Sequence, residues 1–207
     1  MPILASGVKG TYWSTQTDPG GCSLPTGDYQ VQDAVALGQS GALGDLKFEA
    51  GMCGQVLNIN CGGKSVNAIV ASTCNIGSDS CGVDMIESTW NKATSNASPG
   101  ISSCSVSLSL TNPFKDPHMV CYNRPNTAPS PYYLNLGVMN TGGEVVKSAT
   151  VNGVQGTNSN GAWFAFNAQG GNLFNGDSTV TFTFKSGKKQ TFSLGDCKNS
   201  TGVQIFK

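Results

Sequence analysis

The stretch Thr179-Val180-Thr181-Phe182-Thr183-Phe184 decides the fold class of this chain. Polar and apolar side chains alternate in it without a break, and this period of two predicts a β-strand with one buried face. Lys185-Ser186-Gly187-Lys188 follows and predicts a hairpin turn into a second strand over Gln190–Leu194. The sequence therefore predicts at least one antiparallel β-hairpin.

The rest of the sequence has the same character, because turn-forming Gly, Asn, Ser and Pro residues interrupt it at intervals typical of an all-β protein. We expect further strands over Gln55–Asn60, Ser65–Ser72, Ser105–Leu110, Tyr132–Met139 and Gly161–Asn167. Helical signals are few. The spacing of apolar residues predicts one helix over Gly82–Ala93, and a second short helix is possible over Gln32–Leu37.

Cysteine usage indicates the compartment. The chain has 207 residues and eight cysteines, an even count that predicts a disulfide framework and an oxidising environment. We therefore expect a secreted, extracellular or cell-wall protein. The sequence has no Cys-x-x-Cys pair and a single histidine, His118, so zinc ligation is disfavoured. We expect no metal and no cofactor.

The charge balance limits the partners. Twelve basic residues offset twelve acidic ones, and charged residues make up 12% of the chain, against about a quarter in a typical soluble domain. A neutral chain has no electrostatic reason to bind nucleic acid or an anionic membrane, and no apolar run is long enough to span a bilayer. An uncharged polar surface suits neutral sugars. We expect a monomer.

Two domains are predicted, over residues 1–115 and 116–207. Proline-containing turn sequences lie throughout the segment 111–130, and six of the eight cysteines precede it. The other two, Cys121 and Cys197, bracket most of the second half and would form a natural staple for a small sandwich.

Several segments carry a resemblance to a known family. They are Gly10-Thr11-Tyr12-Trp13, Cys53-Gly54 followed by Cys61, Gly82-Val83-Asp84-Met85 followed by Trp90, Ser130-Pro131-Tyr132-Tyr133, and Gly161-Ala162-Trp163-Phe164. In this order they resemble the expansin superfamily. The resemblance implies a mainly β chain, with a six-stranded double-psi β-barrel followed by an immunoglobulin-like carbohydrate-binding β-sandwich.

The resemblance also implies a function: binding of cellulose, xyloglucan or another β-glucan across both domains, and loosening of its packing without hydrolysis. Asp84 would hydrogen-bond the glucan in a groove of the first domain. The groove would also be lined by Thr11, Tyr12, Trp13, Ser14 and Ser72, the last standing where the family commonly has aspartate. Aromatic rings of the second domain would stack on sugar rings. They are Tyr132, Tyr133 and Trp163, with Asn160 near the position of a family aromatic.

The missing base argues against hydrolysis. Inverting family 45 endoglucanases share a related barrel and need two carboxylates, an acid and a base. Asp84 matches the acid, whereas Ser14 stands where those enzymes have the base, and an unactivated hydroxyl stays protonated. Four carboxylates of the first domain could substitute: Asp18, Asp28, Asp33 and Asp45.

Each site residue also has a structural alternative. Asp84 could cap the N-terminus of the predicted helix, and Trp13, Trp163, Tyr132 and Tyr133 could be core residues. On spacing, Trp90 is a core residue. Two functional alternatives accompany these: a weak endoglucanase that uses Asp84 as general acid, and a secreted interaction protein such as an inhibitor, elicitor or allergen.

The resemblance further suggests a Cys22–Cys53 disulfide. The remaining Cys61, Cys74, Cys81 and Cys104 then allow three pairings, of which Cys74–Cys81 closes the simplest loop. Asn96 and Asn199 begin glycosylation sequons, which matter only in a eukaryotic host.

Overall fold

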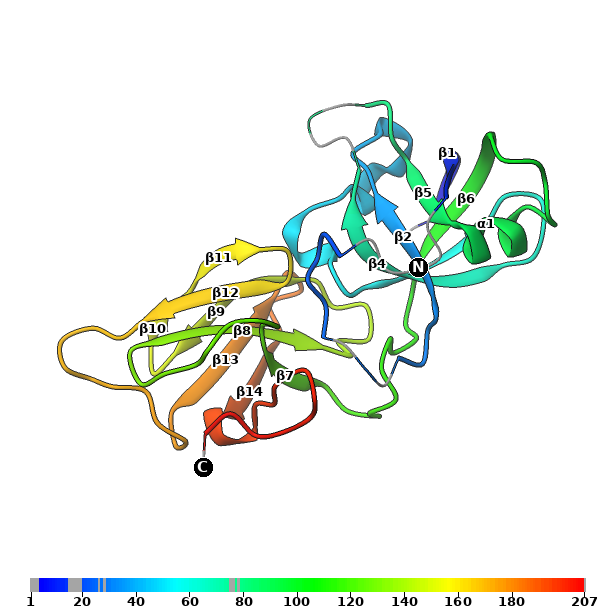
Figure 1. Cartoon of the computed structure of the whole chain (residues 1–207). Helices are drawn as coiled ribbons and strands as arrows, with labels where there is room; N and C mark the ends of the chain where they lie inside the picture. Colours follow the sequence, from blue (N-terminus) through cyan, green and yellow to red (C-terminus); the bar gives the residue numbers. More distant parts are fainter. Residues whose placement is uncertain are drawn as a thin grey trace.

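The computed structural model describes residues 4–14, 20–25, 27, 29–74, 77 and 79–206. Two β-rich units lie side by side, an N-terminal barrel and a C-terminal pair of sheets (Figure 1). The predicted boundary at 115/116 falls between the last strand of the barrel and the first strand of the sheets.

The first unit is a closed barrel of six strands in the order β1-β5-β2-β4-β3-β6. Its strands are β1 (Leu4–Trp13), β2 (Asp33–Leu37), β3 (Val56–Asn60), β4 (Val66–Thr73), β5 (Val83–Ile86) and β6 (Ile101–Ser109). Two pairs, β1 with β5 and β2 with β4, are parallel, and the other pairs are antiparallel. Apolar side chains from all six strands form the interior core.

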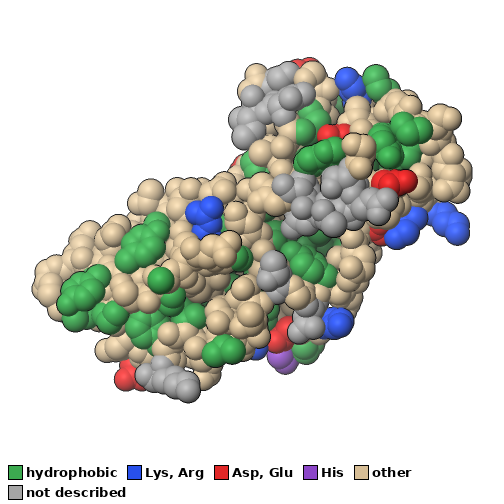
Figure 2. Space-filling view, viewed as in Figure 1, with side chains coloured by type: hydrophobic (Ala, Val, Ile, Leu, Met, Phe, Trp, Pro, Cys, Tyr) green, Lys and Arg blue, Asp and Glu red, His purple; other side chains and the backbone are tan. Residues whose placement is uncertain are grey.

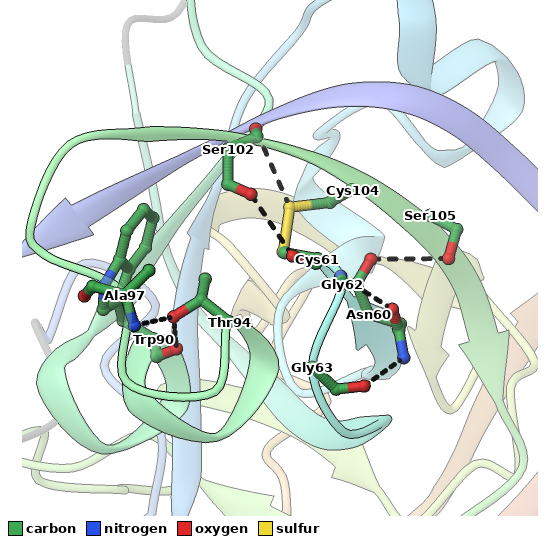
Figure 3. Close-up of a disulfide and its surroundings, with 10 residues drawn as sticks. All are labelled: Asn60, Cys61, Gly62, Gly63, Trp90, Thr94, Ala97, Ser102, Cys104 and Ser105. Carbon is green, nitrogen blue, oxygen red and sulfur yellow. Dashed lines mark hydrogen bonds between the residues drawn. A yellow bond between two sulfur atoms is a disulfide. The ribbon is translucent and has the colours of Figure 1, made fainter.

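Within the residues described for the first unit, one α-helix and two 3-10 helices accompany the barrel: α1 (Glu87–Ala93), η1 (Gly41–Leu46) and η2 (Ala50–Met52). Trp90 of α1 is buried in the barrel core. Its ring lies edge-on to the Tyr12 ring, with the two ring centroids 6.1 Å apart. Its indole N–H donates to the carbonyl oxygen of Ala97 over 2.8 Å. Close by, the Cys61–Cys104 disulfide ties the end of β3 to β6 (Figure 3). The helix and this disulfide therefore close one side of the barrel.

The second unit contains two four-stranded sheets, in the orders β11-β12-β8-β7 and β10-β9-β13-β14. Its strands are β7 (Val120–Asn123), β8 (Tyr133–Met139), β9 (Val146–Val151), β10 (Val154–Gln155), β11 (Thr157–Asn160), β12 (Trp163–Asn167), β13 (Thr179–Phe184) and β14 (Lys189–Ser193). A further 3-10 helix, η3, spans Leu194–Asp196. Both sheets contribute apolar side chains to one core, which the Cys121–Cys197 disulfide adjoins.

The strand predictions are confirmed, because each of the seven predicted ranges overlaps an observed strand. The alternating stretch is β13, with Val180, Phe182 and Phe184 buried, and it pairs with β14 across the predicted hairpin. The Cys22–Cys53, Cys74–Cys81 and Cys121–Cys197 disulfides agree with the pairings suggested from sequence. Cys61–Cys104 is the pairing that the sequence left open.

The helix predictions need correction. Asp33–Leu37 is strand β2, buried along its whole length between β5 and β4, so burial on both faces removes the alternation that would reveal a strand. Only the second half of Gly82–Ala93 is helical. Its first half is β5, which pairs with β1 on one side and β2 on the other.

The two units share a third buried cluster. It contains Ile69 and Ile86 from the barrel strands, and Met139 and Trp163 from the second unit. The side-chain amide of Gln55 donates to Thr141 Oγ1 over 3.0 Å and to the carbonyl oxygen of Glu144 over 3.1 Å. The shared apolar cluster and the hydrogen bonds of Gln55 together hold the two units in a fixed relative position. Among the helices of the described residues, none is long and apolar enough to cross a membrane.

Candidate functional site

A row of four residues crosses the outer face of the barrel. Thr11 of β1 pairs with Asp84 of β5, Asp84 with Ala36 of β2, and Ala36 with Ser72 of β4. Paired residues on neighbouring strands direct their side chains to the same face. The flanking residues Val35, Met85 and Val83 point into the barrel core, so this row faces outward. Three of the predicted site residues, Thr11, Ser72 and Asp84, are thus brought together.

The centre of the row is a hydrogen bond from Thr11 Oγ1 to Asp84 Oδ1, 2.6 Å long. Both residues are partly exposed. The carboxylate can accept several hydrogen bonds, so it retains capacity for other donors, such as sugar hydroxyls. The capping alternative for Asp84 is wrong: the helix begins after Ile86, and Asp84 lies within β5.

The aromatic residues of β1 divide between the two faces. Trp13 is two residues from Thr11 and therefore shares its outer face, where it is partly exposed. Tyr12 points the other way, against the barrel core and the Trp90 ring. The expectation that Tyr12 lines the same surface as Thr11 is therefore wrong, because strand alternation separates them. Ser14 follows the end of β1 and is exposed.

Ser72 is the last residue of the row and lies beneath the segment Gly20–Leu24. We call Gly20–Leu24 the junction segment, because it contacts both units. Ser72 is 7% exposed, and a Cβ at Gly21 would lie 2.2 Å from its hydroxyl oxygen, so a larger residue there would displace the Ser72 side chain. The backbone N–H of Cys22 donates to the carbonyl oxygen of Ala71 over 2.8 Å. The barrel therefore holds the junction segment directly over β4.

The second unit contacts the junction segment from three strands or strand ends. Asn160 Nδ2 donates to the carbonyl oxygen of Gly21 over 3.3 Å, and Trp163 Nε1 to that of Cys22 over 2.9 Å. Arg124, directly after β7, approaches Ser23 Oγ at 3.5 Å. The junction segment therefore connects the outer face of the barrel to the sheet β11-β12-β8-β7.

That sheet has a polar face beside the junction. Its centre is Asn135 of β8, which is 2% exposed. Its amide group donates to the Tyr133 hydroxyl over 3.4 Å, and its carbonyl oxygen accepts from Ser159 Oγ over 3.1 Å. Leu134 and Leu136 on either side of it face the core between the two sheets. Tyr133 and Ser159 therefore border one surface, with Asn135 beneath them.

The predicted stacking residues have different positions. Tyr132 precedes the first residue of β8 and is 65% exposed, and Tyr133 is partly exposed. Trp163 is fully buried between the units, packed on Gly137, so it cannot stack on a sugar ring. The core alternative for Trp163 holds, because its indole N–H meets a backbone acceptor of the first unit.

The surface around these residues carries few charges. Figure 2 shows a face on which charged side chains are sparse over the half that holds β7 to β14, with hydrophobic groups scattered over both halves. Among the described part of the chain, no group of three or more His, Cys, Asp or Glu residues could hold a metal ion.

The candidate substitute bases lie elsewhere or outside the described residues. Asp33 is 8% exposed, points away from the outward row, and binds Lys92 Nζ at 2.7 Å and Ser88 Oγ at 3.0 Å. Asp45 of η1 lines a cavity of about 610 Å³ between the units, together with Glu49 and Lys185. Asp18 and Asp28 lie outside the described residues. Asp84 is the single carboxylate in the described row.

Comparison with solved structures identifies the fold. A point mutant of the expansin of Clavibacter michiganensis, in complex with cellohexaose, superposes with a TM-score of 0.66 at 19% sequence identity, covering 98% of this chain and 92% of that one. The chain has the fold of these expansins. The apo form of the same protein gives a TM-score of 0.65 at the same identity and coverage. No protein-family model and no curated protein matches this sequence.

Sequence reasoning missed three parts of this surface. The alternation of β8 would have placed Asn135 on the face of Tyr133, because the two residues are two positions apart. No local pattern signals that Arg124 or the junction segment lies there. Their positions depend on contacts between residues more than 100 positions apart, such as Arg124 with Ser23.

Proposed function

We propose that this chain is a secreted, non-hydrolytic, expansin-like protein that binds cellulose or a matrix β-glucan across both units and loosens its packing. The double-psi connectivity of the barrel and the immunoglobulin-like topology of the sandwich belong to the same proposal. A fold shared with an expansin crystallised with cellohexaose supports it, and four disulfides fit an oxidising extracellular setting.

The observation that carries the proposal is the composition of the outward row. A glucan lying on it would meet one carboxylate, Asp84, held by Thr11. Inverting hydrolysis needs a second carboxylate about 6.5–9.5 Å away to activate water. Its neighbours across the sheet are Ala36 and Ser72, neither of which can act as that base. The row suits hydrogen bonding of a sugar better than its cleavage.

Binding would continue over the second unit. Tyr132 and Tyr133 offer ring faces to the apolar faces of sugar rings. The junction segment lies between them and the barrel, and its exposed glycines, Gly20 and Gly21, place no side chain in the way. A polymer could therefore pass from one unit to the other.

A pull-down on insoluble cellulose, xylan and chitin, combined with a reducing-sugar assay of the same samples, tests the proposal. We expect wild type to bind cellulose and release no sugar. Tyr133→Ala should reduce binding by about two- to tenfold, and Tyr133→Phe should keep most of it because the ring remains. Sugar release that Asp84→Asn abolishes would instead establish the weak endoglucanase. No binding to any of the polymers would favour the interaction protein.

A further inference from the structure

The single arginine of the chain, Arg124, lies beside the polar face of the second unit. Its backbone N–H donates to the carbonyl oxygen of Asn135 over 2.8 Å, which continues the antiparallel pairing of β7 with β8. Residues paired in this way direct their side chains to the same face. Arg124 therefore shares the face of Asn135 and of Tyr133, two residues further along β8.

The surroundings of the Arg124 side chain are polar and uncharged. Its guanidinium approaches Ser23 Oγ of the junction segment at 3.5 Å. Its backbone partner Asn135 belongs to a polar group, in which the Asn135 amide donates to the Tyr133 hydroxyl and its carbonyl oxygen accepts from Ser159 Oγ. Arg124 is partly buried, and its contact with Ser23 places the guanidinium next to the junction segment.

The guanidinium has no anionic partner among the described residues. Lys92, Lys185, Lys188 and Lys198 each pair with a carboxylate, whereas the Arg124 guanidinium contacts a hydroxyl, that of Ser23. A guanidinium presents five N–H donors in a planar fork that matches a carboxylate. Within the described part of the chain, most of this donor capacity is unused by protein groups and could serve a ligand on the proposed glycan-binding face.

We infer that Arg124 is a carboxylate-recognition site, which makes the protein prefer β-glycans that carry acidic groups, such as uronic acid substituents or oxidised C6 positions. The inference rests on the proposed function, since Tyr133 would hold the neighbouring sugar ring while Arg124 binds the carboxylate. A charge-assisted, two-donor hydrogen bond has both the strength and the geometry for this selection.

Two forms of one polymer test the inference: amorphous cellulose, and the same cellulose with part of its C6 hydroxyls oxidised to carboxylates. Binding isotherms at low salt should show wild type about three- to tenfold tighter on the oxidised form. High salt should lower this ratio. Arg124→Gln should bring the ratio to one without weakening binding to neutral cellulose by the same factor. Arg124→Lys, which keeps the charge and loses the fork, should give an intermediate ratio.

The matched control is Lys189→Gln, which removes one positive charge from β14 in the opposite sheet. It should retain the wild-type ratio. The inference would be overturned if wild type bound oxidised and neutral cellulose equally well, or if both glutamine variants lowered the affinity ratio by the same factor. Binding to neutral cellulose would still support the proposed function in either case. If wild type bound neither neutral nor oxidised cellulose, both the inference about Arg124 and the proposed function would be overturned. Thermal melting of each variant shows that the comparison is made on folded protein.

Discussion

Thr11 Oγ1 donates a 2.6 Å hydrogen bond to Asp84 Oδ1 across the parallel pair of β1 and β5, and this contact sets the direction of the only carboxylate in the outward row of the described barrel. The hydroxyl fixes one oxygen and leaves the other for a ligand. Asp84 then acts as a positioned acceptor on the barrel surface.

Removing this hydroxyl should weaken binding. Thr11→Val keeps the shape of the side chain and removes the donor, so Asp84 can rotate away from the sugar. We expect a loss of about 0.5–1.5 kcal/mol in cellulose binding, measured by adsorption isotherms. Thr11→Ser should restore most of the affinity, and Asp84→Asn should cost at least as much as Thr11→Val. Equal losses in the valine and serine variants would contradict a role for the hydroxyl.

The indole N–H of Trp163 should contribute to the stability of the whole chain. Trp163→Phe leaves the carbonyl oxygen of Cys22 without its donor in a buried interface. We expect the free energy of unfolding to fall by about 1–3 kcal/mol, measured by chemical denaturation. The partly exposed Trp13 offers a control, since Trp13→Phe should change stability by less. Equal losses of unfolding free energy in Trp163→Phe and Trp13→Phe would contradict this prediction.

Gly161 occupies a position that only glycine fits. Its φ is +53°, and a Cβ would lie 2.7 Å from Cys53 Sγ. Gly161→Ala should therefore cost more than the roughly 1–3 kcal/mol of backbone strain alone. Gly187→Ala, with φ +86° and open space around its Cβ, isolates the strain. Thermal and chemical denaturation of both variants should show a larger loss of unfolding free energy for Gly161→Ala. A smaller loss for Gly161→Ala would mean that the residues around Cys53 move to accommodate the methyl group.

The acid stability of the second unit should depend on Glu144. Hydrogen bonds from Lys188 and Ser186 lower the pKa of the Glu144 carboxyl below its ordinary value of 4.5. Because the folded pKa is depressed, the stabilisation is present above 4.5 and is lost as the pH falls through the folded pKa. Lys188→Gln should flatten the decline of unfolding free energy in this acid range. An unchanged slope in that variant would show that the pair contributes nothing measurable.

Much of the fold follows from local pattern. Alternation in Thr179–Phe184 predicts β13, which pairs with β14 across the predicted hairpin. Local pattern fails where tertiary burial determines the state. Asp33–Leu37 has no exposed face to mark it as a strand, because Val35 and Leu37 lie in the barrel core and Ala34 on the opposite face lies in the cluster shared with the second unit.

The candidate site divides in the same way. The motif around Asp84 and the aromatic pair Tyr132–Tyr133 can be found in sequence. The position of Trp163 cannot, because its environment is built from Cys22 and Gly137, residues far from it in the chain. Tyr12 shows that a contiguous motif on a strand is divided between two faces by alternation, so only part of it can line one surface.

The central claim is that this protein loosens cellulose without cutting it. The direct measurement is the extension of cellulose sheets under constant load in the presence of the protein, with reducing sugars measured in the same bath. The account predicts faster extension with wild type, little with Asp84→Asn, and no sugar released in either case. Sugar release that rises with extension and disappears with Asp84→Asn would contradict it and establish a hydrolase.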